Sequence, residues 1–433
     1  MTHNPNIEQL IIRGQKKLHG KVFVSGSKNA SLPIIAATML AKTPSRLHNI
    51  PRLSDTTAML EALNSLDCNI CIHEDQSVSI NPASYCGKGL SKSIAKKLRG
   101  SFLLLGPLLA HYQKADIPLP GGCNIGARPV DVHLKGLEKM GACIELHGGV
   151  VHASCQGRLQ GTDLELEVPS VTGTENLIMA ASLADGITRI HNAAREPEIN
   201  NLCDFINLMG GKIQGAGEST IEIEGVDSLD GKTFNIIYDR LEAGTYMIAT
   251  AITQGEIHIK NIHPDHLTCV IKKLKEVGAE IAVDNSGLHM IMNKKPKAVS
   301  ISTEAHPGFP TDLQAQWLAL NCIAEGSASI QENIFESRFT HAIQLQKMGA
   351  RIQIEGNRVL TQGSDQLIGT DIIASDIRAS AGLVLGALAA KGQTSISNLH
   401  HVDRGYVHLE ENFSNLGADI TRKKETLKEV DTS

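Results

Sequence analysis

The stretch from Pro118 to Asp131 holds the densest group of residues that could do chemistry. Its three glycines and three prolines oppose regular secondary structure, so we expect a loop. The loop contains one thiol, Cys123, close in sequence to the guanidinium of Arg128. A nearby cation lowers the pKa of a thiol, whereas a structural cysteine usually lies on a buried apolar face. The spacing alone leaves two interpretations of Cys123 open, a functional thiol and a passive loop cysteine.

Lys28 is a second candidate, because it lies between a short β-branched segment and a long uncharged run. Small residues surround it in the sequence VSGSKNASLP at 24–33. The glycine spacing of a Walker A loop is absent. A lysine at a helix N-terminus nevertheless suits a phosphate or a carboxylate, since the free N–H groups there favour anions. The alternative is a solvated lysine, which is the commoner situation for a single lysine side chain.

The composition limits the kinds of partner. Among 433 residues, 41 basic and 46 acidic side chains give a net charge of −5, which opposes a nucleic-acid-binding or membrane-binding surface. The longest uncharged apolar stretches are about a dozen residues, against roughly 20 for a membrane-spanning helix. Nine irregularly spaced cysteines, and no signal-peptide pattern at residues 1–15, lead us to expect reduced thiols in a cytoplasmic protein.

Other residues that could bind a metal do not converge in the sequence. Cys68 and Cys71 form a CxxC pair, but no second pair follows at the spacing of a zinc site. Two histidine pairs, at 263/266 and 400/401, lack a convergent third ligand. We therefore predict no metal and no cofactor.

The elements that must position these residues repeat six times along the chain. A five-residue pattern recurs at intervals of 68–74 residues and ends in isoleucine. Its first position is apolar, its second is usually glycine, its third is usually a small residue, and its fourth is variable. The isoleucines are Ile70, Ile144, Ile213, Ile281, Ile352 and Ile420. Each copy of this pattern ends an amphipathic segment, and its glycine suits the left-handed C-cap of a helix that precedes a strand. A long fixed period of this kind indicates a repeat architecture.

A second pattern also recurs six times, a charged residue followed by about a dozen uncharged residues. The charged residues are Lys28, Arg99, Glu175, Glu242, Asp312 and Arg378. Such runs are too long for typical strands and too apolar for surface helices, so we predict six buried helices. Three such helices can share one core, which favours two pseudo-symmetric domains over the alternative, a single open solenoid. Cations at three of the six helix N-termini suit a multiply anionic substrate.

Seven strings of the sequence carry a resemblance to a known family. They are SGSKNA at 25–30, PGGCNIGARPVD at 120–131, NAAREPEI at 192–199, FPTDLQAQ at 309–316, FESRF at 335–339, DIRASAGLVL at 376–385 and HVDRGY at 401–406. In content and order they resemble the UDP-N-acetylglucosamine 1-carboxyvinyltransferases. The match runs from about Ile11 to Arg422, nearly the whole chain.

The resemblance implies an α/β (α+β) enolpyruvyl-transferase fold. Such a fold has two pseudo-symmetric domains, each of three βαβαββ repeats around buried helices, an inside-out α/β barrel. It places residues 28–238 in the first domain, residues 1–27 and 239–424 in the second, and residues 425–433 in a disordered tail. The chain would cross between the domains near Ser27 and Tyr238, and the domains would close over a cleft.

The implied reaction moves the enolpyruvyl group of phosphoenolpyruvate to the 3-hydroxyl of UDP-N-acetylglucosamine and releases phosphate, through a tetrahedral intermediate. It is the first committed step of peptidoglycan synthesis, and therefore serves cell-wall growth, cell shape and cell division. Fosfomycin is the family's known covalent inhibitor. The chemistry requires a proton for C3 of phosphoenolpyruvate, a base for the sugar hydroxyl, and cations around the phosphate. The two substrates are the expected partners, and no nucleic acid, membrane or cofactor is implied.

The resemblance also implies a role for each candidate residue. Cys123 matches the loop cysteine that acts as general acid, and Asp312 matches the carboxylate proposed as the base. Lys28 and Arg404 complete the catalytic set. Residues that match phosphoenolpyruvate-binding positions are Lys28, Asn29, Arg128, Arg338, Arg378 and Arg404. Residues that match contacts to the nucleotide sugar are Arg99, Arg128, Pro129, Val130, Asp131, Val132, Ser170, Val171 and Ile334.

The sequence departs from the family near the nucleotide. Val168 stands where some members carry a lysine, and Thr172-Gly173 replaces a commoner Gly-Ala pair. Two alternative functions remain. The sister enolpyruvyl transferase of the shikimate pathway is the nearest, but its pattern lacks the Gly-Gly-Cys loop. A catalytically silent relative that binds a UDP-sugar need not keep all four catalytic candidates, and all four are present.

Overall fold

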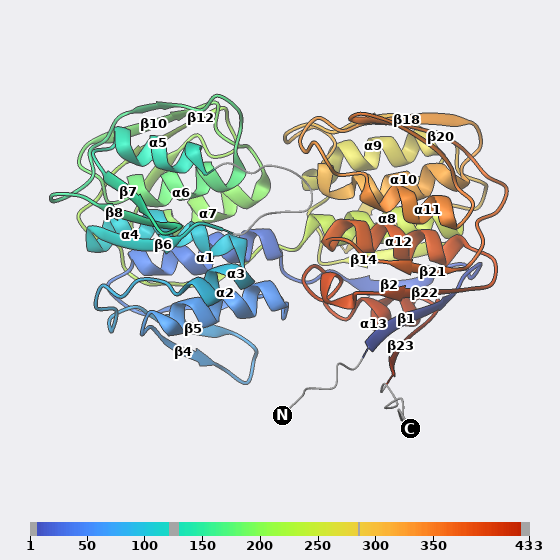
Figure 1. The fold of residues 1–433 in the computed structure, drawn as a ribbon, viewed down its shortest axis with the longest axis horizontal. Coiled ribbons are helices and arrows are strands. Elements are labelled where there is room, and N and C mark those ends of the chain that lie inside the picture. The colour runs from blue at the N-terminus through green and yellow to red at the C-terminus, as the bar shows by residue number, and fades with distance from the viewer. Residues whose placement is uncertain (1–6, 121–129, 285, 426–433) are drawn as a thin grey trace, which may run out of the picture. The chain divides into compact units, whose positions relative to one another are not determined.

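The computed structural model describes residues 7–120, 130–284 and 286–425, which form two compact units (Figure 1). In this described chain, the N-unit comprises residues 25–120 and 130–239, and the C-unit comprises residues 7–24 and 240–425. The chain passes between them after Val24 and after Asp239. Glu425, which the sequence analysis placed in a tail, ends strand β23, and the rest of that predicted tail, 426–433, lies outside the described residues.

Each unit contains three small sheets. In the N-unit the first sheet has the strand order β13 (Thr233–Asn235), β3 (Ser45–His48), β5 (Val78–Asn81), β4 (Asn69–Ile72). The second has the order β6 (Lys114–Pro118), β8 (Val150–Ser154), β7 (Cys143–His147). The third has the order β11 (Lys212–Gln214), β12 (Thr220–Glu224), β10 (Ile187–His191), β9 (Asp163–Glu165). In the C-unit the strand orders are β15 (Glu280–Asp284), β16 (Gly287–Ile291), β14 (Glu256–Lys260), β2 (His19–Phe23); β17 (Ile301–Ser302), β18 (Ser327–Gln331), β20 (Arg358–Gln362), β19 (Arg351–Glu355); and β21 (Asp371–Ile373), β22 (Gln393–Ser397), β1 (Ile7–Arg13), β23 (Asp419–Glu425).

Five of the six sheets share one full pairing pattern and the sixth shares part of it, which confirms the predicted repeat. In five of them one parallel pair is followed by two antiparallel pairs, for example β2 with β14, β14 with β16 and β16 with β15. The sheet of β6, β8 and β7 shows only the antiparallel pairs. In the described chain all six sheets are open, so the implied barrel consists of separate sheets around helices rather than one closed sheet.

Six largely buried helices lie inside these sheets, three in each unit (Figure 1). They are α1 (Lys28–Ala37), α4 (Leu105–Tyr112) after η2 (Arg99–Leu104), α6 (Val171–Ala181), α8 (Arg240–Thr253), α10 (Gln314–Ile323) after η4 (Thr311–Leu313), and α12 (Ile377–Ala389). Helices α8, α10 and α12 pack against one another, as do α4 and α6. Because each unit has its own helical core, the single open solenoid is excluded.

Six further helices alternate with the buried ones and close the repeats. They are α2 (Ser54–Ser65), α5 (Asp131–Lys139), α7 (Pro197–Leu208), α9 (Thr268–Val277), α11 (Thr340–Lys347) and α13 (Leu409–Asn415), with a short extra helix α3 (Lys92–Lys97). The recurring glycine follows these helices with a positive φ, 92° at Gly141, and Asp67 takes the same role in the first repeat at 65°. In the part of the chain that is described, no helix has the length and apolar character needed to cross a membrane.

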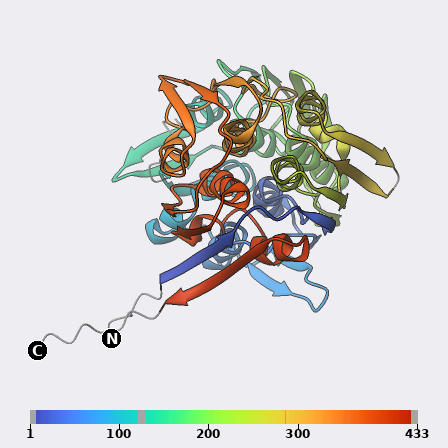
Figure 2. The same cartoon turned by 90° about the vertical axis from the view of Figure 1, so that its right-hand side faces the viewer.

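The two N-terminal strands belong to the C-unit. Strand β2 pairs with β14, while β1 lies between β22 and β23 from the other end of the chain. Figure 2 shows β1 in blue beside β23 in red. In the N-unit, β13 from the end of the unit pairs with β3 from its beginning. Each unit is therefore completed by a strand that is distant in sequence.

Candidate active site

Three predicted site residues, Cys123, Arg128 and Pro129, fall in the segment 121–129 and lie outside the described residues. The flanking elements are described. Strand β6 ends at Pro118, and α5 begins at Asp131 with Val130 as its N-cap residue. The segment with the predicted acid therefore connects a strand and a helix of the N-unit.

Lys28 is the first residue of α1 and is buried. Ser27 caps this helix, since its hydroxyl accepts a hydrogen bond from the N–H of Ala30 at 3.2 Å. The Lys28 ammonium lies 3.5 Å from Oδ2 of Asp55, a buried carboxylate on α2. The backbone N–H of Lys28 donates to Oδ2 of Asp239 at 3.2 Å. The solvated-lysine alternative is therefore wrong, because Lys28 is a buried cation with a carboxylate partner.

The other predicted N-unit contacts gather at helix N-termini. Arg99 is the first residue of η2, and Val171 is the first residue of α6. Ser170 caps α6 by accepting a hydrogen bond from the N–H of Gly173 at 3.2 Å. A β-carbon at Gly173 would lie only 2.8 Å from Cγ1 of Val132, so the starts of α5 and α6 touch closely. These helix starts present backbone N–H groups, which suits the anionic nucleotide proposed for them.

A buried histidine beneath these helix starts was missed in the sequence. The amide oxygen of Asn176 accepts from the N–H of Gly106 at 2.6 Å, so its amide nitrogen donates to Phe102 O at 3.0 Å and to Nδ1 of His133 at 2.9 Å. His133 therefore carries its proton on Nε2, which lies 3.4 Å from the hydroxyl of Thr172. Burial and the charge of Arg99 lower the pKa of His133 to about 4. It is a neutral structural group at neutral pH.

The C-unit brings three predicted residues together. Asp312, in η4, accepts a hydrogen bond at Oδ1 from Nη2 of Arg338 at 2.6 Å. Nη2 of Arg378 lies 3.7 Å from Oδ2 of the same carboxylate. Both guanidinium side chains are 5% exposed, whereas that of Asp312 is 27% exposed. A partly accessible carboxylate between two buried cations suits general base chemistry next to an anion.

A polar network behind Arg378 was also missed. The Tyr406 hydroxyl accepts from Nη1 of Arg378 at 3.5 Å and from the Gln316 amide at 3.1 Å. Gln316 also donates to Thr245 Oγ1 at 3.0 Å and to Asp312 O at 3.2 Å. The network joins α8, α10, α12 and the segment before α13, so it fixes Arg378 relative to Asp312. Its members are distant in sequence, and their spacing therefore gave no signal.

The remaining predicted residues are partly accessible to solvent. Asn29 is half-buried in α1, and Ile334 is 41% exposed after β18. Arg404 is half-buried and follows Asp403, whose carboxylate is held by Arg422 at 2.6 and 3.1 Å.

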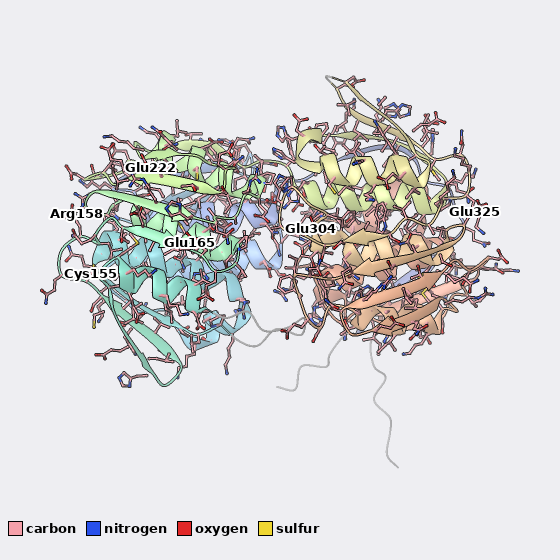
Figure 3. The ribbon with its side chains drawn as sticks, turned by 90° about the horizontal axis from the view of Figure 1, so that it is seen from above. Cys155, Arg158, Glu165, Glu222, Glu304 and Glu325 are labelled. Atoms are coloured by element: carbon pink, nitrogen blue, oxygen red, sulfur yellow. The ribbon has the colours of Figure 1, made fainter. Side chains whose placement is uncertain are left out.

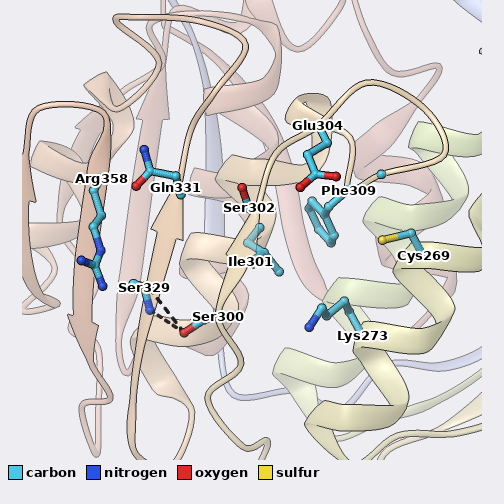
Figure 4. Close-up of a pocket in the computed structure, with 11 residues that line it drawn as sticks. Cys269, Lys273, Ser300, Ile301, Ser302, Glu304, Phe309, Ser329, Gln331 and Arg358 are labelled. Atoms are coloured by element: carbon cyan, nitrogen blue, oxygen red, sulfur yellow. Dashed lines mark hydrogen bonds between the residues drawn. The ribbon is translucent and has the colours of Figure 1, made fainter.

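Other polar features do not involve the predicted site. Arg158, labelled in Figure 3, donates to three backbone carbonyls of the N-unit, including Ala184 O at 2.9 Å, and pairs with Asp185 and Asp227. A cavity of about 540 Å³ lies between α9 and the sheet of β17 and β18 (Figure 4), and none of the predicted residues lines it. Within the described ranges, no group of three His, Cys, Asp or Glu side chains is arranged to hold a metal.

Comparison with solved structures supports the fold. The enolpyruvyl transferase NikO from Streptomyces tendae matches with a TM-score of 0.88 at 24% identity, over 97% of this chain and 100% of that one. An EPSP synthase from Acinetobacter baumannii matches with a TM-score of 0.75 at 20% identity, over 96% of this chain and 100% of that one. Both share this architecture.

Sequence comparison supports the family. Residues 12–413 match the family model described as EPSP synthase (3-phosphoshikimate 1-carboxyvinyltransferase). A UDP-N-acetylglucosamine 1-carboxyvinyltransferase of Coxiella burnetii is 48% identical over 417 residues, 96% of each chain. That of Halorhodospira halophila is 47% identical over 416 residues, 96% of this chain and 99% of the relative. The chain therefore belongs to the UDP-N-acetylglucosamine 1-carboxyvinyltransferases, within the EPSP synthase family of enolpyruvyl transferases.

Proposed function

We propose that this protein transfers the enolpyruvyl group of phosphoenolpyruvate to the 3-hydroxyl of UDP-N-acetylglucosamine, with release of phosphate. The observation that carries the proposal is the 48% identity, over nearly the whole chain, to enzymes of that name. The carboxylate of Asp312 between Arg338 and Arg378 supports it, because the reaction deprotonates a hydroxyl beside an anionic substrate.

The reaction is an addition followed by an elimination. In the addition, O3 of the sugar bonds to C2 of phosphoenolpyruvate, Asp312 takes the hydroxyl proton, and Cys123 gives a proton to C3. In the elimination, the bond from C2 to the phosphate oxygen breaks and C3 loses a proton, which restores the double bond. The role of Cys123 rests on the sequence match, since it lies outside the described residues.

Fixed cations are proposed to stabilise the charge that builds on phosphoenolpyruvate. Arg338 and Arg378 are held by Thr311 and Tyr406, at 2.8 and 3.5 Å, so they need little reorganisation during the reaction. Lys28, Arg128 and Arg404 are proposed to bind the same substrate, with Asn29 beside them. The proposed contacts to the nucleotide sugar are Arg99, Arg128, Pro129, Val130, Asp131, Val132, Ser170, Val171 and Ile334.

The proposed reaction gives the protein a role in building the cell wall. Its product would enter peptidoglycan synthesis in the cytoplasm, and through it cell shape and division. Fosfomycin, an epoxide that carries a phosphonate, would attack the same site, since the cations proposed to bind phosphate also suit a phosphonate.

One alternative acceptor is 3-phosphoshikimate, which appears in the description of the matching family model. Phosphate release from phosphoenolpyruvate, measured separately with UDP-N-acetylglucosamine and with shikimate 3-phosphate, separates the two reactions. We expect phosphate release when UDP-N-acetylglucosamine is the acceptor and none when shikimate 3-phosphate is the acceptor. We also expect Cys123→Ser to release no phosphate with either acceptor. Release with shikimate 3-phosphate alone would refute the proposal. Binding of the nucleotide sugar with no release would identify the silent relative.

A further inference from the structure

We propose that Glu332 is a positioning residue, which holds Arg338 through the hydroxyl of Thr311 and thereby fixes the carboxylate of Asp312. This inference rests on the proposed function for its kinetic consequences. Glu332 follows β18 and is 2% exposed. Nothing in the sequence motifs singled it out, and it does not touch Asp312.

The Glu332 carboxylate is fully engaged. Its Oε1 accepts hydrogen bonds from the N–H groups of Ile334 and Phe335, at 2.9 and 3.1 Å, and from the hydroxyl of Thr303 at 2.9 Å. Its Oε2 accepts from the hydroxyl of Thr311 at 2.9 Å. All four donors are uncharged. Among them, only the Thr311 hydroxyl also bonds a cation, Arg338, so it links the buried Glu332 carboxylate to that guanidinium.

The direction of each hydrogen bond between Glu332, Thr311 and Arg338 follows from which of these groups can donate and which can accept. An ionised carboxylate can only accept, so the single proton of the Thr311 hydroxyl points to Glu332. Thr311 Oγ1 must then accept from Nη1 of Arg338, which lies 2.8 Å away. The guanidinium also stacks over the ring of Phe335 at 4.9 Å, and the N–H of Phe335 is itself held by Glu332. Glu332 therefore positions both residues that hold the Arg338 guanidinium, namely Thr311, which bonds Nη1, and Phe335, whose ring stacks on the guanidinium plane.

The fixed guanidinium in turn determines the orientation of Asp312. Nη2 of Arg338 holds Oδ1 of Asp312 at 2.6 Å, which leaves Oδ2 on the side of Arg378. Negative and positive side chains therefore alternate along this series of contacts, from Glu332 to Arg338, Asp312 and Arg378. A rotated Arg338 would turn the base away from the sugar hydroxyl, and small misplacements of reacting groups lower turnover strongly.

Four variants test this chain of contacts. Thr311→Val removes the link, and Thr311→Ser keeps a hydroxyl. Thr303→Val is the control, because it removes a hydrogen bond of the same 2.9 Å length to the same carboxylate but does not touch Arg338. It also removes the bond that Thr303 accepts from the N–H of Asn333 at 2.9 Å, so it is the more disruptive change outside Arg338. In Glu332→Gln the amide oxygen stays with the three donors at Oε1, so the amide N–H₂ faces Thr311 and competes with Arg338 as donor.

We expect Thr311→Val and Glu332→Gln to lower kcat about tenfold, while the Kd of UDP-N-acetylglucosamine stays within about twofold. Thr311→Ser should recover most of the turnover, and Thr303→Val should lose less than about twofold. In an Asp312→Asn background, Thr311→Val should cause a smaller loss than in the wild type, because only the contribution of Arg338 to phosphoenolpyruvate binding is then affected. Equal losses in Thr311→Val and Thr303→Val would overturn the proposal.

Crystal structures of the two valine variants give a readout independent of activity. The distance from Arg338 Nη2 to Asp312 Oδ1 should lengthen in Thr311→Val and stay unchanged in Thr303→Val. An unmoved Arg338 in Thr311→Val would overturn the positioning role. If Arg338 moves but the wild-type protein releases no phosphate with UDP-N-acetylglucosamine, the proposed function fails and the positioning role stands.

Discussion

Replacing Asp312 with Asn tests whether the carboxylate between Arg338 and Arg378 serves turnover or substrate binding. Asparagine keeps an oxygen for the 2.6 Å bond from Arg338, so its amide N–H₂ must take the place of Oδ2 and face Arg378. The change removes the proposed base and leaves two buried cations without their shared carboxylate. At the 3.7 Å separation of Arg378 and Asp312, the direct Coulomb attraction of one such pair is about 4.5 kcal/mol at an effective dielectric constant of 20, before the cost of desolvating the two charges.

We expect turnover of Asp312→Asn to fall at least about 100-fold, because a positioned base is lost. Binding of UDP-N-acetylglucosamine should stay within about tenfold, because the contacts proposed for it at Arg99, Ser170 and Val171 are unchanged. Phosphate-release kinetics and calorimetric titration measure the two quantities. Glu222→Gln is the matched control, because Glu222 also accepts an arginine bond, from Nε of Arg189 at 2.8 Å, on the sheet of β10 and β12, which holds none of the predicted site residues. It should turn over normally.

Two results would refute this reasoning about Asp312. Near-normal turnover of Asp312→Asn would remove the carboxylate from the mechanism. A large loss of nucleotide-sugar binding with normal turnover at saturation would make Asp312 a substrate anchor rather than a base.

Four further predictions concern thiols and buried titratable groups. Fosfomycin should label Cys123 alone of the nine cysteines, faster with UDP-N-acetylglucosamine present, because the cations proposed to bind phosphate would hold the phosphonate beside this thiol. Burial also raises the pKa of Cys68, Cys203 and Cys322 to about 12, and peptide mapping that shows several labelled thiols would contradict the prediction. Cys123→Asp should keep some turnover and lose labelling, whereas an active Cys123→Ser would refute the assignment of the acid. Burial, with Glu198 and Glu196 nearby, raises the pKa of Glu175, so the unfolded chain loses this proton first and stability falls as pH rises above about 4.5; Glu175→Gln should therefore melt higher than wild type at pH 8, and an equal or lower Tm would count against it. The pKa of His133, lowered from 6.5 to about 4, means that the unfolded chain binds a proton first, so the free energy of unfolding should fall between pH 7 and pH 5; urea titrations with no such fall would exclude this.

The repeat pattern in the sequence predicts most of the fold, because each repeat has to bury one helix. The runs after Lys28 and Arg378 correspond closely to α1 and α12. One detail differs. Glu175 lies inside α6 rather than at its start, since a carboxyl group can be buried when it is neutral, whereas Glu242 lies in the first turn of α8 as expected.

The site is only partly predictable from the sequence. Motifs identify the residues proposed to meet substrate, such as Asp312 and Arg338, because the chemistry restricts their types. The residues that hold them, such as Asp55, Glu332 and Tyr406, come from segments that only the packed fold brings together. Their side chains also have no distinctive spacing, so no sequence pattern marks them.

The structure of the product tests the proposed function most directly. The wild-type protein, incubated with phosphoenolpyruvate and UDP-N-acetylglucosamine, should form one enolpyruvyl ether for each phosphate released, and NMR should place that ether on O3 of the sugar. Phosphate released without an ether, an ether on another hydroxyl, or a product formed only from shikimate 3-phosphate would contradict it.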